Sequence, residues 1–460
     1  MLLRTLLLLL LPLCAFAGED SALDRYIRTP DPAYRYSLVS SVKLPGFTMH
    51  VLDMTSQRWL TEAEVDRPEW RHWLVLYQPD QVDHRTGLLL ISGGSITSKA
   101  PTSPDLLLST MAVQTKTVVA DLKMVPNEPL KFADLAETRS EDGIIAYTWR
   151  KFLETGDERW PARLPMTKAA VRAMDTVTSY CGSLAANPLR IDRFVVAGAS
   201  KRGWTTWTTA AVDRRVTAII PMVIDALNVD ASFLHHFRAY GFWAPAIGDY
   251  EREGIMPWLG TPQWRSLMEI EDPWEYRDRL TMPKFIFNSG GDQFFLPDSS
   301  QFYFDSLPGE KFLRYVPNTD HGLNSPDLAF DLLAVYQAFL NCEPRPRFSW
   351  KADRSAGTIR LKTMDEPTQV LLWEAVNPEA RDFRLEKIGP AWKSRPLSGE
   401  NGVYVATPDP PAQGFKAFFL ELTFAGGGSA PFRFTTEVVV TPDVYPFDAP
   451  AAPTARRKTR

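Results

Sequence analysis

Residues 194–203 constrain the fold of this 460-residue chain more than any other stretch. Their sequence, FVVAGASKRG, begins with four apolar residues that predict a short buried strand. Ser200 follows in a glycine-flanked turn, and residues 204–212 can continue as a helix. A tight strand-to-helix turn needs a residue without a side chain two positions before the serine, and Gly198 meets that need. The N–H of Lys201 would then lie at a helix N-terminus, where negative charge is favoured.

This order of strand, serine and helix is typical of the nucleophile elbow of α/β-hydrolases, whose pattern is Gly-x-Ser-x-Gly. The match is incomplete, because Arg202 stands where the second glycine belongs and Gly203 comes one residue later. The same pattern also fits an ordinary helix with a serine at its N-cap. The residues that follow in the chain favour the elbow.

A nucleophilic serine needs an adjacent base, and the base needs a carboxylate that fixes its tautomer. In α/β-hydrolases the chain order is serine, acid, histidine. Asp292 lies in a Gly-Gly-Asp turn after the predicted strand 284–288, and His321 follows the predicted strand 311–316. The other five histidines lie before Ser200 or before any suitable acid loop. The sequence therefore predicts a catalytic triad of Ser200, Asp292 and His321.

Two other aspartates are alternatives for the acid. Asp298 lies further along the loop that holds Asp292, and Asp225 ends the strand pattern that follows the elbow helix. Asp292 is preferred because it follows its predicted strand directly.

The oxyanion hole is expected to use backbone donors. The N–H of Lys201 is the first, and Gly94 or Ser95, after the predicted strand 88–91, would supply the second. The side chains of Lys201 and Arg202 could either stabilise the negative charge that develops on the oxyanion or form ion pairs at the surface.

Strand and helix patterns alternate between residues 88 and 340, which predicts an α/β fold with a mainly parallel sheet and helices on both faces. Ligands of such folds bind outside the carboxyl ends of the strands. Residues 138–141 (TRSE) have the pattern of a capping box for a helix over 141–153.

Residues 228–280 are rich in aromatic and acidic side chains, so they predict either a cap over the active site or helices that simply cover the sheet. Asp225, Glu269, Glu271 and Glu275 are candidate substrate-binding residues. In a peptidase that trims free N-termini, such carboxylates would pair with the substrate ammonium. The alternative for the three glutamates is the solvated face of a helix.

The sequence EPRPR at 343–347 breaks the helix pattern and predicts a boundary after a hydrolase domain over 18–343. From 348 to 447 the chain has only strand patterns, including one at 383–388, which predicts a separate immunoglobulin-like β-sandwich without a disulfide. We expect none of these strands to join the central sheet. Residues 449–460 are rich in proline, alanine and basic residues and predict a disordered tail.

Residues 1–17 have the pattern of a signal peptide, with Arg4, a leucine-rich core and the small-residue site Ala15-Phe16-Ala17. We expect a periplasmic or secreted protein with no stable membrane anchor after cleavage. Cys181 falls on the apolar face of a predicted helix and is expected to be a buried thiol, although export would permit a bridge to Cys342.

The formal net charge of −4 does not indicate a nucleic-acid partner. The chain has no HExxH, no metal-type Cys-His cluster and no phosphate-binding Gly-rich loop ending in Lys-Ser or Lys-Thr. We therefore expect no cofactor and no metal, and a small-molecule or peptide substrate. The oligomeric state is left open.

Several long strings resemble the PhoPQ-activated pathogenicity-related protein family, a bacterial group that belongs with the α/β-hydrolases. They are RSEDGIIAYTWRKFL, RLPMTKAAVRAMDTV, GASKRGWTTW, GGDQFFLPD, VPNTDHGL, LLWEAVNPEARDFR and FTTEVVVTPD. The resemblance covers nearly the whole mature chain and implies a hydrolase fold followed by a β-sandwich, with Ser200, Asp292 and His321 as the triad. It implies no substrate. The Ser-Lys elbow is also similar to the Ser-Arg elbow of glucuronoyl esterases, and EDPWEYRDRLTMPKFIF is similar to prolyl-oligopeptidase-like peptidases and acyl esterases.

The first functional hypothesis is an exported serine hydrolase that cleaves an ester or amide bond through an acyl-enzyme. The second is a secreted binding or signalling protein on a hydrolase scaffold, with little or no turnover. The complete set of triad residue types favours the enzyme, and Arg202 at the glycine position favours the alternative.

Overall fold

The structure is a computed structural model that describes residues 20–185, 188–428 and 430–450. The predicted signal peptide and most of the predicted tail lie outside these residues. Cys181 is buried and Cys342 is exposed, and neither is in a disulfide. Within the described ranges, no helix is both long enough and apolar enough to cross a membrane.

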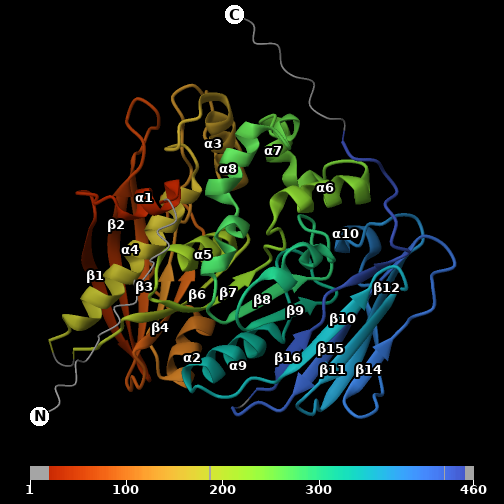
Figure 1. Cartoon of the computed structure of the whole chain (residues 1–460). Helices are drawn as coiled ribbons and strands as arrows, with labels where there is room; N and C mark the ends of the chain where they lie inside the picture. Colours follow the sequence, from red (N-terminus) through yellow and green to blue (C-terminus); the bar gives the residue numbers. More distant parts are fainter. Residues whose placement is uncertain (1–19, 186–187, 429, 451–460) are drawn as a thin grey trace, which may run out of the picture.

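In the described part of the chain, a sheet of 14 strands runs through the molecule (Figure 1). Its first nine strands in spatial order are β1 (Arg35–Leu44), β2 (Phe47–Arg58), β3 (Glu69–Pro79), β5 (Val119–Leu122), β4 (Thr86–Ile91), β6 (Arg193–Ala199), β7 (Val216–Met222), β8 (Lys284–Ser289) and β9 (Lys311–Val316). Neighbours from β1 to β5 are antiparallel, and neighbours from β5 to β9 are parallel. The six parallel strands place their carboxyl ends at one edge of the sheet.

Helices cover both faces of the parallel strands. They are α2 (Leu106–Thr115), α3 (Asp142–Thr155), α4 (Arg163–Gly182), α5 (Lys201–Val212) and α9 (Leu328–Leu340). Val195 and Ile220 belong to the core under α2 and α9, whereas Val196 and Ile219 belong to the core under α3, α4 and α5. Because both faces are buried, the parallel strands are mostly apolar. This is the α/β-hydrolase fold expected from the sequence.

The aromatic segment after β7 forms short helices above the carboxyl ends of the strands (Figure 1). They are α6 (Val229–Tyr240), α7 (Gly248–Arg252), α8 (Pro262–Glu271) and the 3₁₀ helix η3 (Pro273–Arg279). Trp264 of α8 is fully buried and meets Trp149 of α3 edge to face at 5.6 Å. The segment therefore packs firmly against the helices of the fold.

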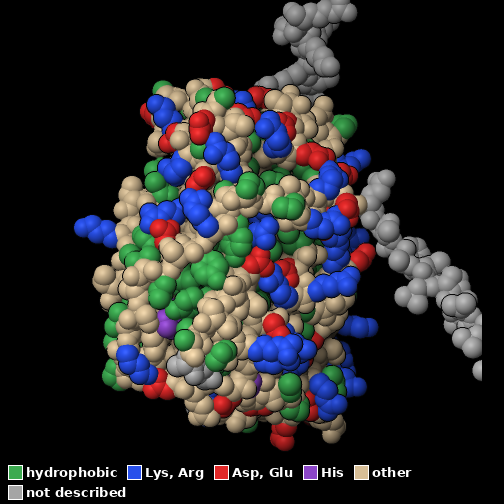
Figure 2. Space-filling model, turned by 90° about the vertical axis from the view of Figure 1, so that its left-hand side faces the viewer, with side chains coloured by type: hydrophobic (Ala, Val, Ile, Leu, Met, Phe, Trp, Pro, Cys, Tyr) green, Lys and Arg blue, Asp and Glu red, His purple; other side chains and the backbone are tan. Residues whose placement is uncertain are grey.

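β1 is one edge of the large sheet, on the side that Figure 2 faces, where hydrophobic side chains gather between charged ones. Leu38, Val39 and Val42 are exposed on this strand. A bulge between Leu38 and Ser40 interrupts the register with β2. Bulges of this kind make an edge strand a poorer template for pairing with another chain.

The chain after residue 347 forms strands in two sheets. They are β10 (Phe348–Asp353), β11 (Thr358–Thr363) and β14 (Val403–Ala406) in a small sheet, and β12 (Gln369–Asn377), β13 (Lys393–Pro396), β15 (Phe415–Phe424), β16 (Phe432–Thr435) and β17 (Val439–Thr441) in the large one. The strand predicted over 383–388 is wrong, because this stretch contains the one-turn helix α10 (Leu385–Ile388). The N–H of Leu385 donates to the carbonyl of Gly291 at 2.9 Å, so the stretch is fixed by a contact with the loop after β8.

The expectation that no strand after residue 347 joins the central sheet is also wrong. β16 lies antiparallel to β9, with Thr435 opposite Leu313. Buried Arg314 of β9 donates to Glu421 of β15 at 2.6 Å and to Asp331 of α9 at 2.9 Å. The physical reason is that β9 would otherwise be an open edge with unpaired backbone groups, which another strand can satisfy.

This continuity predicts that residues 18–343 do not fold stably alone. A fragment that ends at residue 343 loses Glu421 and leaves Arg314 incompletely paired, which costs about 3 to 5 kcal/mol for a buried ion pair. It also exposes Phe312, which stacks on Phe434 at 4.3 Å. We expect an insoluble fragment, or one without a cooperative thermal transition, when it is purified beside the full chain. A soluble fragment that melts cooperatively near the full-length temperature would contradict the shared core.

Candidate active site

Ser200 occupies a strained turn between β6 and α5. Its backbone angles are φ 57° and ψ −129°, and its N–H donates to the carbonyl of Met222 at 2.9 Å. A non-glycine residue with positive φ costs on the order of 1 to 3 kcal/mol, and such residues gather at functional sites. The turn therefore has the strained strand-to-helix geometry expected from the sequence, with Ser200 at its tip.

The two glycines explain why the incomplete pattern still forms this turn. A Cβ on Gly198 would lie 2.5 Å from the carbonyl oxygen of Arg202. A Cβ on Gly203 would lie 2.8 Å from the carbonyl oxygen of Met222. Close backbone approach thus requires glycine at position 203, whereas the residue before it can carry a side chain.

His321 and Asp292 form a close pair on the loops after β9 and β8. The Nδ1 of His321 lies 2.8 Å and 3.0 Å from the two carboxylate oxygens of Asp292, which is buried. Among the described residues, the buried Nε2 of His321 has no hydrogen-bond partner. When Nδ1–H donates to the carboxylate, Nε2 is the nitrogen that can accept a proton.

The two rival acids are held by other partners. Asp298 lies 2.8 Å from His235 Nε2 and 2.6 Å from Arg381. Burial opposes ionisation of Asp298, but Arg381 and His235 outweigh it and keep its pKa well below its usual value. Asp225 accepts hydrogen bonds from the hydroxyls of Tyr303 and Tyr315, at 2.7 Å and 2.6 Å. Burial raises the pKa of Asp225 to about 8. Asp292 is thus the carboxylate beside His321.

The side chains of Lys201 and Arg202 form ion pairs. Lys201 Nζ lies 2.6 Å from Glu141 and 3.0 Å from Asp142, and Arg202 donates to both oxygens of Glu141 at 2.6 Å and 2.8 Å. The capping box expected at 138–141 is therefore wrong. Glu141 makes no side-chain cap bond, and its own backbone is strained at φ 49° and ψ −128°. Its carboxylate is used to hold the two cations that follow Ser200.

This contact predicts that Glu141 positions the elbow. Glu141→Gln leaves two nearly buried cations with only two counterions, Asp142 at 3.0 Å from Lys201 and Glu128 at 3.9 Å from Arg202. Because 45% of the Glu141 side chain is exposed, we expect a loss of about 1 to 2 kcal/mol in unfolding free energy, less than for a fully buried pair. We also expect kcat to fall about tenfold, because the turn that carries Ser200 loosens.

The measurement is chemical denaturation together with kcat on a substrate of the wild type. Glu137→Gln is the matched control, because Glu137 is exposed in the same loop. Equal effects of the two substitutions would contradict the positioning role of Glu141.

The expected second oxyanion donor lies near the elbow but outside its cavity. Ile91 of β4 is opposite Gly198 of β6, so the loop with Gly94 and Ser95 leaves the sheet beside the elbow. A Cβ on Gly93 would lie 2.5 Å from the guanidinium of Arg202, which therefore packs over this loop. Gly94 and Ser95 do not line the cavity that contains Ser200, whereas Lys201 does.

The cavity beside Ser200 is small, with a volume of about 30 Å³. Apart from Ser200 and Lys201, its lining comprises Asp142, Trp149, Trp204, Ile224, Ala226, Phe233, Ile247, Tyr250, Phe294 and Phe295. Phe233, Ile247 and Tyr250 come from the segment after β7, so this segment covers the site as a cap. The sequence prediction missed Phe294 and Phe295, although their position two and three residues after Asp292 could have indicated them.

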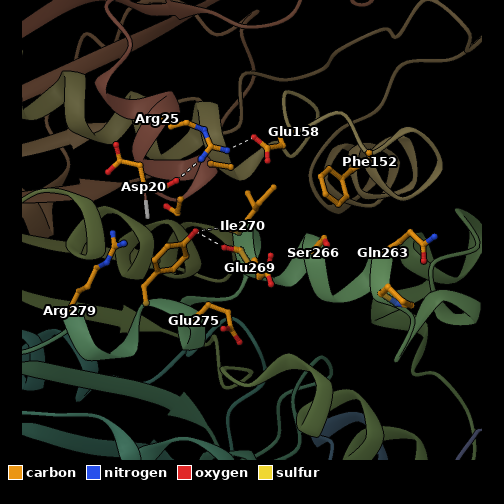
Figure 3. A pocket seen from close by; sticks show the side chains of 15 residues that line it. Asp20, Arg25, Phe152, Glu158, Gln263, Ser266, Glu269, Ile270, Glu275 and Arg279 are labelled. Carbon is orange, nitrogen blue, oxygen red and sulfur yellow. Dashed lines mark hydrogen bonds and ion pairs between the residues drawn. The ribbon is translucent and has the colours of Figure 1, made fainter. Parts of the chain in front are cut away.

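The three candidate glutamates do not reach this cavity. Glu269 and Glu275 line a separate cleft of about 780 Å³ that also contains Arg25 and Arg279 (Figure 3). Glu271 is fully buried and accepts a hydrogen bond from Arg163 at 3.2 Å. Glu271 therefore has neither of the two roles expected from the sequence: it does not face Ser200, where it could bind a substrate ammonium, and it does not lie on a solvated helix face. The orientation of α8 places it in the core.

Within residues 20–185, 188–428 and 430–450, no cluster of three or more histidine, cysteine or carboxylate side chains could hold a metal ion.

Comparison with known proteins identifies relatives of the chain. It is 37% identical to "Autocrine proliferation repressor protein A" of Dictyostelium discoideum, over 96% of this chain and 95% of that protein. Among solved structures it is similar to acetyl xylan esterase 1 of a Thermoanaerobacterium species, with 14% identity, a TM-score of 0.48 and coverage of 69% of this chain and 92% of that one. It is also similar to a glucuronoyl esterase of Solibacter usitatus, with 14% identity, a TM-score of 0.41 and coverage of 70% and 91%. The family match spans residues 23–384, and the chain belongs to the PhoPQ-activated pathogenicity-related protein family.

Proposed function

We propose that this protein is a serine hydrolase that cleaves an ester or amide bond through an acyl-enzyme. The observation that carries the proposal is the Asp292–His321 pair, whose outer nitrogen is buried and unpartnered among the described residues. The strained elbow at Ser200 supports it, because strain of this kind costs stability and persists where function requires it.

In the proposed reaction, the Oγ of Ser200 attacks the substrate carbonyl carbon while its proton passes to Nε2 of His321. The tetrahedral intermediate collapses, the bond to the leaving group breaks, and His321 returns the proton to that group. His321 then takes a proton from a water molecule, which attacks the acyl-enzyme. The bond to Ser200 breaks, His321 returns the proton to Oγ, and the acid is released. Asp292 keeps the histidine in the required tautomer and stabilises the imidazolium that forms.

The oxyanion is proposed to bind the N–H of Lys201 at the start of α5, where the helix dipole adds to the hydrogen bond. Gly94 or Ser95 remains the proposed second donor, because their loop leaves the sheet next to Gly198. The ammonium of Lys201 already contacts two carboxylates, so its backbone and not its side chain is given this role. The reaction needs no cofactor.

A second function is a binding or signalling protein on the same scaffold. The observation that favours it is the 37% identical relative, which is named as a repressor of proliferation and not as an enzyme. Arg202, bound to Glu141 and packed over Gly93, would then be part of a rigid scaffold and not of a catalytic turn.

The experiment that separates the two functions is a screen of purified wild type and Ser200→Ala against p-nitrophenyl esters and aminoacyl amides. Turnover that disappears with Ser200 supports the hydrolase and also decides between esterase and peptidase. Background rates with every substrate would favour the binding protein.

A further inference from the structure

The loop that lines the cavity beside Ser200 is in contact with His321, the proposed base. The Oδ1 of Asp292 accepts the N–H of Phe294 at 2.7 Å, and that of Phe295 at a longer 3.4 Å. The ring of Phe294 lies 4.3 Å from the ring of His321, centre to centre. One carboxylate therefore orients the histidine and also fixes the loop that forms a wall of the cavity.

The part of the lining that Trp149, Trp204 and Tyr250 form is closely packed. The indole N–H of Trp204 donates to the carbonyl of Glu271, and the guanidinium of Arg163 lies 4.7 Å from the Trp204 ring centre. Trp149 meets Trp204 edge to face at 6.0 Å and packs on Tyr250 at 5.1 Å. Interiors packed in this way do not widen at low cost, because added volume forces side chains from their preferred rotamers.

Two charged or hydroxyl-bearing residues of the lining already have partners. Lys201 Nζ contacts Asp142 at 3.0 Å, and the hydroxyl of Tyr250 donates to the same carboxylate at 3.2 Å. The rest of the lining is apolar apart from the hydroxyl of Ser200 and the indole N–H of Trp149, which has no hydrogen-bond partner among the described residues. A polar substituent that entered the cavity would lose its water and find few groups to replace it, which lowers affinity.

We infer that this cavity is an acyl pocket that accepts a short, unbranched, apolar acyl group and rejects long ones. A cavity needs on the order of 10 to 15 Å³ to hold one water-sized group, so about 30 Å³ leaves room for two or three such groups. Acetyl, propionyl and butyryl groups fit this room, and an octanoyl group does not. The inference names the substrate class of the serine hydrolase proposed above and rests on that function.

The test measures kcat/KM for p-nitrophenyl acetate, butyrate and octanoate with the wild-type protein. We expect octanoate to be turned over about 100-fold less efficiently than acetate, because overpacking by several methylenes cannot be accommodated. Phe233→Ala opens the cap side of the cavity and should raise the octanoate-to-acetate ratio by about tenfold or more. Phe237→Ala is the matched control, because Phe237 lies on the same helix but does not line the cavity.

Covalent labelling by a fluorophosphonate probe separates failure of this inference from failure of the proposed function. If Ser200 is labelled but octanoate reacts as well as acetate, or no short ester is turned over, the pocket assignment is wrong while the nucleophile stands. If Phe237→Ala changes the ratio as much as Phe233→Ala, the assignment is also wrong. If Ser200 is not labelled, the proposed function fails and the acyl pocket fails with it.

Discussion

Ser200→Ala is expected to lower kcat by on the order of 10⁶-fold on any substrate that the wild-type protein turns over. The hydroxyl is the proposed attacking group, and the remaining groups provide only orientation and oxyanion binding. The melting temperature should stay close to that of the wild type, because the Ser200 side chain is only partly buried and makes no capping hydrogen bond to α5 that the substitution would remove. Initial rates and thermal denaturation of the same preparation provide the measurement.

Ser266→Ala is the matched control. Ser266 is an exposed serine in the large cleft that Glu269 and Glu275 also line (Figure 3). We expect the Ser266→Ala variant to turn over substrate at the wild-type rate. If Ser266→Ala is the inactive variant and Ser200→Ala is active, the reaction takes place in the larger cleft and the elbow is structural.

Asp292→Asn is expected to lower kcat by on the order of 10⁴-fold. An amide in place of the carboxylate can donate to Nδ1 of His321, which would leave the proton on Nε2 and remove the base. The amide oxygen can still accept the N–H of Phe294, so the loop should keep its conformation. The measurement is kcat with the melting temperature as a check on folding.

Asp298→Asn provides the contrast. It removes a buried charge that pairs with Arg381 and His235, so it should cost about 3 to 5 kcal/mol of stability. The activity of each folded molecule should change little, because neither partner touches His321. If Asp298→Asn abolishes activity in the folded fraction and Asp292→Asn does not, the acid has been assigned to the wrong residue.

The sequence was informative where the structure depends on local pattern. β4, β6, β8 and β9 are short and mostly apolar because both faces of the sheet are buried, and this property is visible in the sequence. The Asp292–His321 pair could be anticipated for a related reason. Both residues lie in the loops that follow such strands, and parallel neighbouring strands bring the loops at their carboxyl ends together.

Contacts between segments that are distant in the sequence could not be predicted from local patterns. Residues 138–141 have the local pattern of a capping box, but Lys201 and Arg202 bind Glu141 from 60 residues away and draw it out of that role. The pairing of β16 with β9 likewise depends on an edge left open more than 100 residues earlier in the chain.

The sequence also did not show which side of helix α8 faces the core. Glu269, Glu271 and Glu275 looked equivalent in the sequence, yet Glu271 faces the buried guanidinium of Arg163 and the other two face a cleft. The orientation of α8 is set by Trp264 and its aromatic neighbours. Such packing is a property of the assembled fold and not of a short stretch of sequence.

The most direct test of the central claim is labelling of the folded protein with a fluorophosphonate probe, followed by peptide mapping by mass spectrometry. We expect one adduct, on Ser200, that is absent in Ser200→Ala and forms far more slowly in His321→Ala. An unlabelled wild-type protein with a normal thermal transition, or an adduct on another residue, would contradict it.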